Sequence, residues 1–170
     1  MAPAGLTPDG RLRAVRARIA HAVAEAGRDA AAVRLLAVSK TFDAAAVREL
    51  AACGQLEFGE NYLQEALEKQ AALADLPLRW HFIGPIQSNK TRAIAEAFSW
   101  VHSVDRLKIA ERLSAQRPAG LPPLQVCIEV NISGEASKGG VTAAELPALA
   151  DAMAALPNLQ LRGLMAIPAP

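Results

Sequence analysis

The sequence is poor in cysteine, and its 170 residues contain only Cys53 and Cys127. Both lie in or beside apolar runs, and two cysteines cannot build the disulfide framework of a small secreted domain. We therefore expect a reducing compartment, and specifically the cytoplasm. The N-terminal segment lacks the apolar core of a signal peptide. The arginine-rich stretch 11–28 favours a surface helix over a transit peptide, because Glu25 and Asp29 interrupt its positive charge.

Long hydrophobic runs and an excess of one charge are also missing. The net charge is +1, from 18 basic and 17 acidic residues, so the chain lacks the basic footprint of a nucleic-acid-binding protein. No apolar stretch is long enough to span a bilayer, and we expect no membrane partner. With 52% hydrophobic residues, 11 glycines and 11 prolines, the composition is typical of an ordered globular chain.

Segments of helical and strand-like periodicity alternate along the chain. A helix is expected over about 8–27, begun by Thr7 with Pro8 in its first turn. The βα units occupy about 34–165, with strands expected at 34–38, 56–58, 79–83, 100–102, 124–130 and 160–165. Strands that alternate with helices in this way predict right-handed βαβ units and a parallel sheet.

Polar residues mark where the intervening helices should begin. Asp43 is expected to cap 44–52, Asn61 and Gln64 to form a capping box for 62–73, Ser88 to cap 88–98, Asp105 to open 105–116, and Thr142 with Glu145 to begin the last helix, which Pro147 must bend or restart.

The expected architecture is a TIM-type (β/α)8 barrel within a single domain over 1–170. No glycine fingerprint follows the first strand, which disfavours a dinucleotide-binding fold. A closed barrel needs eight strands and typically about 250 residues. We therefore expect about six of the eight strands, with strands seven and eight missing, so that the chain is either a fragment or an open sheet.

Lys40 is the strongest candidate for chemistry, because it follows the first buried strand at the carboxyl end, where α/β proteins place their functional groups. A lysine that forms a Schiff base needs a neutral amine, and burial favours that form. The alternative is a lysine whose stem lies along the sheet edge while its amine reaches water. Position alone does not separate these two interpretations.

Four further segments carry weaker signals. Asn61 is either a ligand-binding amide or a helix cap, and His81 is either a satisfied core histidine or a group that orients a flat ligand. Residues 88–90 and 131–140 are possible anion sites, with a helix start and a surface loop as the simpler explanations. Met165 is more typical of a core than of a contact. No pattern of histidines or carboxylates indicates a metal site.

Taken together, these segments resemble a known family. The strings are Ala-Val-Ser-Lys-Thr (37–41), Phe-Gly-Glu-Asn-Tyr (58–62), Trp-His-Phe-Ile-Gly-Pro-Ile-Gln-Ser-Asn-Lys (80–90), His-Ser-Val-Asp (102–105) and Arg-Gly-Leu-Met-Ala-Ile-Pro (162–168). Their order and spacing resemble those of the pyridoxal phosphate homeostasis protein family, over nearly the whole chain.

The resemblance implies a barrel similar to the N-terminal domain of alanine racemase, with pyridoxal 5'-phosphate held on Lys40 as an aldimine. Asn61, His81 and Met165 would face the cofactor. The implied role is buffering and delivery of the cofactor by a monomer, with transient contact to apoenzymes and no turnover. The alternative is a racemase-like enzyme, which needs a second acid–base group. Alanine racemase takes that group, a tyrosine, from a second domain, whereas Tyr62 is the only tyrosine here.

The C-terminal end departs from the family pattern. Family members continue beyond 167–170 into two motifs that bind the phosphate and place an arginine at the pyridine nitrogen. If residues 1–170 are the whole polypeptide, the resemblance implies that Lys40 remains but most of the phosphate cradle is lost.

Overall fold

The computed structural model describes residues 7–135 and 138–168, and its six strands form one parallel sheet in the order of the sequence. The strands are β1 (Ala37–Val38), β2 (Glu57–Glu60), β3 (Arg79–Phe82), β4 (Trp100–Val104), β5 (Leu124–Glu129) and β6 (Leu159–Met165). The helices are α1 (Pro8–Glu25), α2 (Ala44–Ala52), α3 (Leu63–Ala72), α4 (Thr91–Ala97), α5 (Leu107–Gln116) and α6 (Leu146–Ala154). Parallel strands with helical crossovers confirm the expected fold class, and the sheet stays open between β6 and β1.

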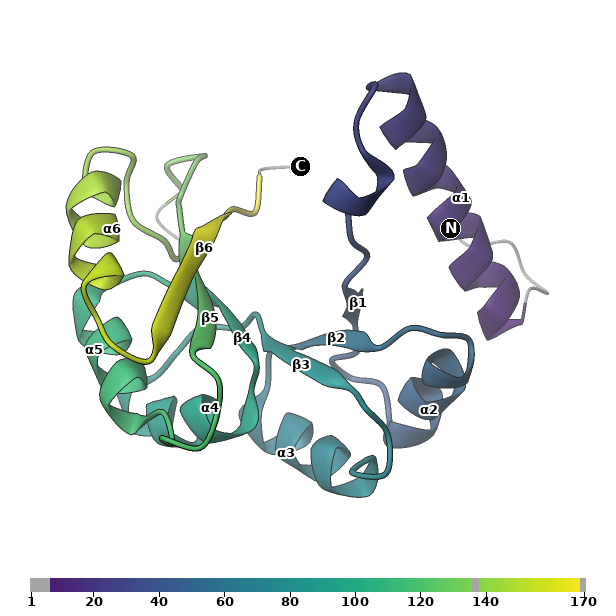
Figure 1. Cartoon of the computed structure of the whole chain (residues 1–170), viewed down its shortest axis with the longest axis horizontal. Coiled ribbons are helices and arrows are strands. Elements are labelled where there is room, and N and C mark those ends of the chain that lie inside the picture. The colour runs from purple at the N-terminus through teal and green to yellow at the C-terminus, as the bar shows by residue number, and fades with distance from the viewer. Residues whose placement is uncertain (1–6, 136–137, 169–170) are drawn as a thin grey trace.

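Helices α2 to α6 lie along one side of the curved sheet, and α1 stands apart beyond β1 (Figure 1). The core lies between this helical layer and the sheet, because alternate strand residues point toward the helices. Phe58, Phe82 and Val101 from the strands are buried there with Ile94 and Leu113 from the helices. A continuous core on the convex side therefore holds the sheet in its curvature.

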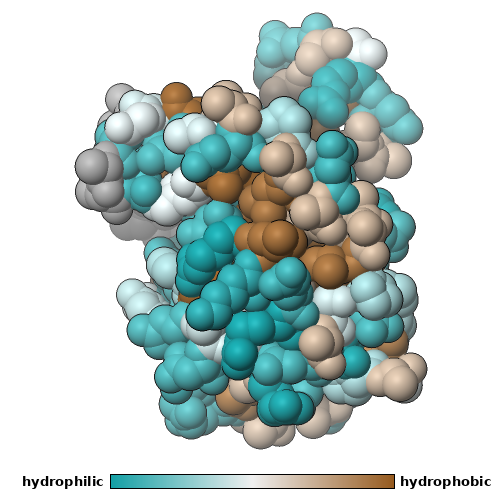
Figure 2. All heavy atoms as spheres, turned by 90° about the vertical axis from the view of Figure 1, so that its left-hand side faces the viewer, coloured by the Kyte–Doolittle hydropathy of each residue, from teal (hydrophilic) through white to brown (hydrophobic). Residues whose placement is uncertain are grey.

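The opposite, concave face of the sheet is only partly covered. Val38, Gly59, His81 and Trp100 are register partners across β1 to β4, so they form one row on this face. Val38 at the β1 edge is 49% exposed and Leu164 at the β6 edge is 60% exposed. Hydrophobic side chains also gather in the middle of the side on which α6 lies, with hydrophilic residues to their left and below them (Figure 2). No helix in the described part of the chain is long and apolar enough to cross a membrane.

Two of the expected helix starts are confirmed at the level of hydrogen bonds. The Thr7 hydroxyl accepts from the Gly10 amide, and the Asp43 carboxylate accepts from the Ala46 amide at 2.9 Å. Proline follows Thr7 at the first helical position, where its missing N–H costs nothing.

The helices expected at 62–73, 88–98 and 105–116 are present, but their expected caps are wrong. Tyr62, not Asn61, precedes α3, and no side chain caps that helix, so the Asn61–Gln64 capping box does not form. Ser88 begins a separate 3₁₀ turn, and its carbonyl oxygen accepts from the Thr91 hydroxyl. The helix α5 begins at Leu107 rather than at Asp105.

The Thr142–Glu145 capping box does form, with the Thr142 amide donating to Glu145 at 2.9 Å, and the turn it makes leads directly into α6, because the Leu146 amide donates to the Thr142 carbonyl oxygen at 3.2 Å. The helix α6 then begins at Leu146, because Pro147 has no N–H to donate and fits only the first turn. The expected restart at Pro147 is therefore confirmed. The first strand is shorter than 34–38, because β1 pairs with β2 only from Ala37 onward.

Replacing Leu113 with alanine should lower the free energy of unfolding by about 2–5 kcal/mol, because this side chain is fully buried between the helices and the sheet. Urea unfolding followed by circular dichroism measures the change. The matched control is Leu121→Ala, at a side chain that is 42% exposed, which should change stability by less than about 0.5 kcal/mol. Equal losses in the two variants would contradict the placement of the core.

Candidate functional site

The carboxyl ends of the six strands meet at one edge of the sheet, as parallel strands require. A cleft of about 480 Å³ opens at this edge. Its walls include Asn61 after β2, Ile83 after β3, Asp105 after β4, Glu129 and Asn131 at the end of β5, and Lys138. Open α/β sheets bind ligands at this edge, which makes it the candidate functional site.

Lys40 lies in a tight turn that follows β1 at the same edge of the sheet. The Ser39 carbonyl oxygen accepts from the Phe42 amide at 3.1 Å, so residues 39–42 form a four-residue turn with Lys40 at its second position. Thr41, the third residue, has φ +68°. Positive φ at this position is typical of a type II turn, which favours glycine. Lys40 is exposed, and it makes no hydrogen bond or ion pair with the residues that the structure describes.

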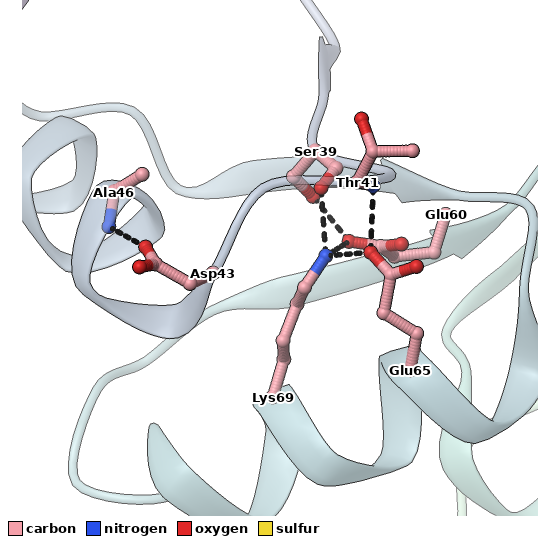
Figure 3. A network of polar contacts seen from close by, with 7 residues as sticks. All are labelled: Ser39, Thr41, Asp43, Ala46, Glu60, Glu65 and Lys69. Atoms are coloured by element: carbon pink, nitrogen blue, oxygen red, sulfur yellow. Dashed lines mark hydrogen bonds and ion pairs between the residues drawn. The ribbon is translucent and has the colours of Figure 1, made fainter.

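A buried amine, Lys69 of α3, lies beneath this turn (Figure 3). Its Nζ donates to the Ser39 carbonyl oxygen at 2.7 Å, to Glu60 Oε1 at 2.7 Å and to Glu65 Oε1 at 2.6 Å. Glu60 Oε1 also accepts from the Ser39 hydroxyl at 2.6 Å, and Glu65 Oε1 accepts from the Thr41 amide at 2.7 Å. The residues on both sides of Lys40 are therefore tied to the same charged cluster.

Asn61 lines the cleft directly after β2. Its side-chain oxygen Oδ1 is buried and has no hydrogen-bond partner among the described residues. The Asn61 backbone is held from the other side, because a Cβ at Gly84 would lie 2.4 Å from the Asn61 carbonyl oxygen. Only glycine permits this approach. The amide is thus available to a ligand, and the interpretation of Asn61 as a helix cap is wrong.

His81 lies one residue before the end of β3, on the concave face of the sheet. Its Nδ1 is 2.9 Å from His102 Nε2, its ring stacks on Trp100 with centroids 5.5 Å apart, and its buried Nε2 has no partner among the described residues. Burial is the main reason that the pKa of His81 falls from 6.5 to about 3, and His102, Arg79 and Arg34 lower it further. The ring is neutral at physiological pH, and it does not appear among the residues of the cleft wall.

The cleft wall carries charges of both signs. Burial, and then the nearby Asp105, raise the pKa of Glu129 above its usual value. Lys138 forms an ion pair with Glu135 at 3.1 Å and donates to the Pro168 carbonyl oxygen at 3.3 Å. The cleft therefore combines a cation with two carboxyl groups, one of which is biased toward its protonated form.

Of the remaining predicted positions, part of 131–140 lines the cleft, whereas Met165 and residues 88–90 are not among its lining residues. Met165 ends β6, is half-buried, and its carbonyl oxygen accepts from the Val130 amide at 2.8 Å. Two residues of the candidate anion loop 131–140, 136 and 137, lie outside the described residues. Within the described part of that loop, the Asn131 side chain accepts from the Gly134 amide and donates to the Glu135 carbonyl oxygen. Across the described residues, no group of three or more potential ligands forms a metal site.

Sequence reasoning missed Lys69 and Glu65, although a signal existed. Lys69 lies three residues after buried Ala66 and four before buried Leu73, so it falls on the buried face of α3. A lysine in an apolar stripe needs an internal partner, and Glu65 lies one turn before it, on the same side of the helix.

The sequence of this chain is similar to those of known proteins. The family model of the alanine racemase N-terminal domain matches residues 11–170. A pyridoxal phosphate homeostasis protein of Pseudomonas aeruginosa is 74% identical over 156 residues, 92% of this chain and 68% of that protein. Its namesake in Escherichia coli K12 is 55% identical over 162 residues, 94% of this chain and 69% of that protein.

Solved structures give the same fold. PipY of Synechococcus elongatus, solved with PLP bound, has a TM-score of 0.76 and 42% sequence identity, and the match covers 88% of this chain and 70% of PipY. Alanine racemase of Corynebacterium glutamicum has a TM-score of 0.61 and 21% identity, over 81% of this chain and 39% of the racemase. The likeness to the racemase shows the fold alone.

The histidine pair should make stability fall as the pH is lowered. Because the pKa of His81 is lower in the folded state, the unfolded chain binds this proton first as the pH falls through 6.5, and the folded chain binds it only near pH 3. The contribution of His81 to the free energy of unfolding is therefore fully present above pH 6.5. Below that pH it decreases by about 1.4 kcal/mol per pH unit. Burial lowers the pKa of His102 as well, which adds to the slope.

Urea unfolding of wild type and His81→Gln between pH 4 and 6.5 measures this effect. The variant should lose stability less steeply as the pH falls. His21→Gln, on exposed α1, serves as the control and should keep the wild-type slope. An unchanged slope in His81→Gln would contradict the assignment of a neutral, buried His81.

Proposed function

Because this chain belongs to the family of pyridoxal phosphate homeostasis proteins, we propose that it binds pyridoxal 5'-phosphate and serves to hold and deliver that cofactor. The single observation that carries the proposal is the position of Lys40, whose turn lies at the edge of the sheet where the cleft opens. The amine is exposed and unpaired among the described residues, whereas the backbone around it is tightly held.

The residues at this edge fit the cofactor. When bound, pyridoxal phosphate supplies an aldehyde that condenses reversibly with a primary amine, forming a C=N bond and releasing water. Lys40 provides the amine. Asn61 offers a buried, unpartnered amide oxygen on the cleft wall, and Lys138 places a cation there that favours an anionic group. His81 and Met165, at the ends of β3 and β6, are proposed to support the pocket.

A role without turnover is supported by the names of the relatives, which describe homeostasis rather than a reaction. We propose that the chain acts as a monomer in the cytoplasm and hands the cofactor transiently to apoenzymes. The two cysteines, Cys53 and Cys127, are free thiols, which is consistent with a reducing compartment.

One observation favours a second candidate, a racemase-like enzyme. Glu129 lies on the cleft wall with a raised pKa, and a carboxyl group of that kind is suited to acid–base work. A racemase also needs a group on the opposite face of the bound substrate. Tyr62, the only tyrosine of the sequence, is 55% exposed.

Lys40 should be the residue that becomes covalently labelled. Wild-type chain incubated with pyridoxal phosphate and then treated with borohydride, which reduces C=N to a stable secondary amine, should yield one dominant labelled peptide containing residue 40. Lys40→Ala should lose at least about nine tenths of this label, and the control Lys90→Ala, at another exposed lysine beyond a strand end, should retain it. Dominant labelling of wild type elsewhere would refute the assignment.

Racemisation assays separate the two candidate functions. With pyridoxal phosphate added, the chain should not interconvert L- and D-alanine or L- and D-serine above the rate of free cofactor. Turnover that exceeds this background and disappears in Glu129→Gln would instead establish the enzyme.

A further inference from the structure

We propose that Lys69, Glu60 and Glu65 form a positioning device for Lys40, by holding the 39–42 turn in the conformation that presents the amine to the cofactor. This inference rests on the proposed function. None of these three residues lines the cleft. They would act on the cofactor only through Lys40, and are therefore positioning residues. We call these three side chains the turn clamp.

The turn clamp reaches the backbone on both sides of Lys40 (Figure 3). Before Lys40, Ser39 makes three hydrogen bonds to residues outside the turn: its amide donates to the Gly59 carbonyl oxygen at 3.0 Å, its hydroxyl donates to Glu60, and its carbonyl oxygen accepts from Lys69. After Lys40, the Thr41 amide donates to Glu65. The main chain of Lys40 is thereby held by hydrogen bonds at Ser39 and at Thr41, whereas the Lys40 side chain is not held by the described residues.

The conformation that the clamp holds is one the local sequence opposes. Thr41 has φ +68°, and a β-branched residue at positive φ is an outlier because its Cβ crowds the backbone. Glycine would favour such a turn, but threonine does not. The turn therefore depends on contacts from outside itself, and the bond from Thr41 to Glu65 is the contact that acts on the strained residue.

The charged composition of the turn clamp indicates that its role is to orient the 39–42 turn rather than to stabilise the fold. Lys69 is 4% exposed and Glu60 is fully buried, and Glu60 Oε2 has no partner among the described residues. Buried ion pairs add little stability relative to apolar side chains of the same volume, because desolvation cancels most of the attraction. Such pairs do fix the orientation of the groups that they join. Each of the three Nζ protons of Lys69 is donated to a separate acceptor.

The clamp also links the turn to rigid elements. Glu65 and Lys69 are one turn apart on α3, and Glu60 ends β2. Reacting groups held in one arrangement combine faster than groups that must search for it, so a turn fixed to a helix and a strand should speed the reaction of the Lys40 amine. Loss of the clamp should slow that reaction without removing the amine.

The test compares covalent labelling of Lys40 by pyridoxal phosphate, trapped with borohydride and quantified on the peptide that contains residue 40. Lys69→Met and Glu65→Ala should each slow labelling about tenfold or more relative to wild type, as expected when a charge-assisted hydrogen bond is lost. Glu65→Gln, which keeps an oxygen that can accept from the Thr41 amide, should recover most of the wild-type rate.

The matched control is Arg117→Met. Arg117 is 8% exposed, and its guanidinium donates to the carbonyl oxygens of Ala95 and Phe98 at 2.6 and 2.8 Å, far from the turn in sequence and contacts. Its loss removes a buried cation and should destabilise the fold, but Lys40 labelling should remain within about twofold of wild type. All variants are compared at a temperature at which circular dichroism shows them folded.

The outcomes distinguish failure of the turn clamp from failure of the proposed function. Wild-type labelling at Lys40 with equal rates in Glu65→Ala, Glu65→Gln and Arg117→Met would refute the turn clamp and leave the proposed function standing. Absence of Lys40 labelling in the wild type would refute the proposed function itself. If Lys69→Met does not fold, Glu65→Ala decides, because the Glu65 side chain is 31% exposed and its removal opens no deep cavity.

Discussion

The burial of one positive charge constrains how the elements from β1 to α3 are arranged. Lys69 is almost inaccessible to water, so its ammonium group must find its partners inside the protein. It finds them on the end of β2, on the residue after β1 and one turn earlier on its own helix. Removing one partner of such a pair typically costs about 3–5 kcal/mol. Two strand ends and a helix are thereby fixed relative to one another at the edge where Lys40 lies.

The sheet supplies the second condition for the site. Because all six strands run in parallel, their carboxyl ends bring together residues that are far apart in the sequence, from Asn61 to Ile167, around one cleft. The core that supports this edge lies on the helical side, and the concave face carries the His81–His102 pair, of which His81 stacks on Trp100. The packed core therefore stabilises the helical face of the sheet, and the polar His81 and His102 side chains lie on the concave face.

The alternation of strands and helices could be predicted because it depends on local periodicity, and the Asp43 cap because the acceptor is three residues from its donor. The conformation of Asn61 could not be predicted, since it depends on the close approach of Gly84, two residues after the end of β3. The helical spacing of Lys69 from Ala66 and Leu73 indicates a buried lysine paired with Glu65, but only the tertiary contacts show that this pair lies beneath the turn and binds Ser39 and Thr41. The positive φ of Thr41 could not be predicted either, because threonine disfavours positive φ and a prediction from sequence follows the preference of the residue.

A crystal structure of the chain soaked with pyridoxal phosphate tests the central claim most directly. The account predicts continuous electron density from Lys40 Nζ to the cofactor, a ring beside Asn61, and a 39–42 turn with the same contacts to Lys69 and Glu65. Density for the cofactor on another lysine, with Lys40 Nζ free, would contradict it.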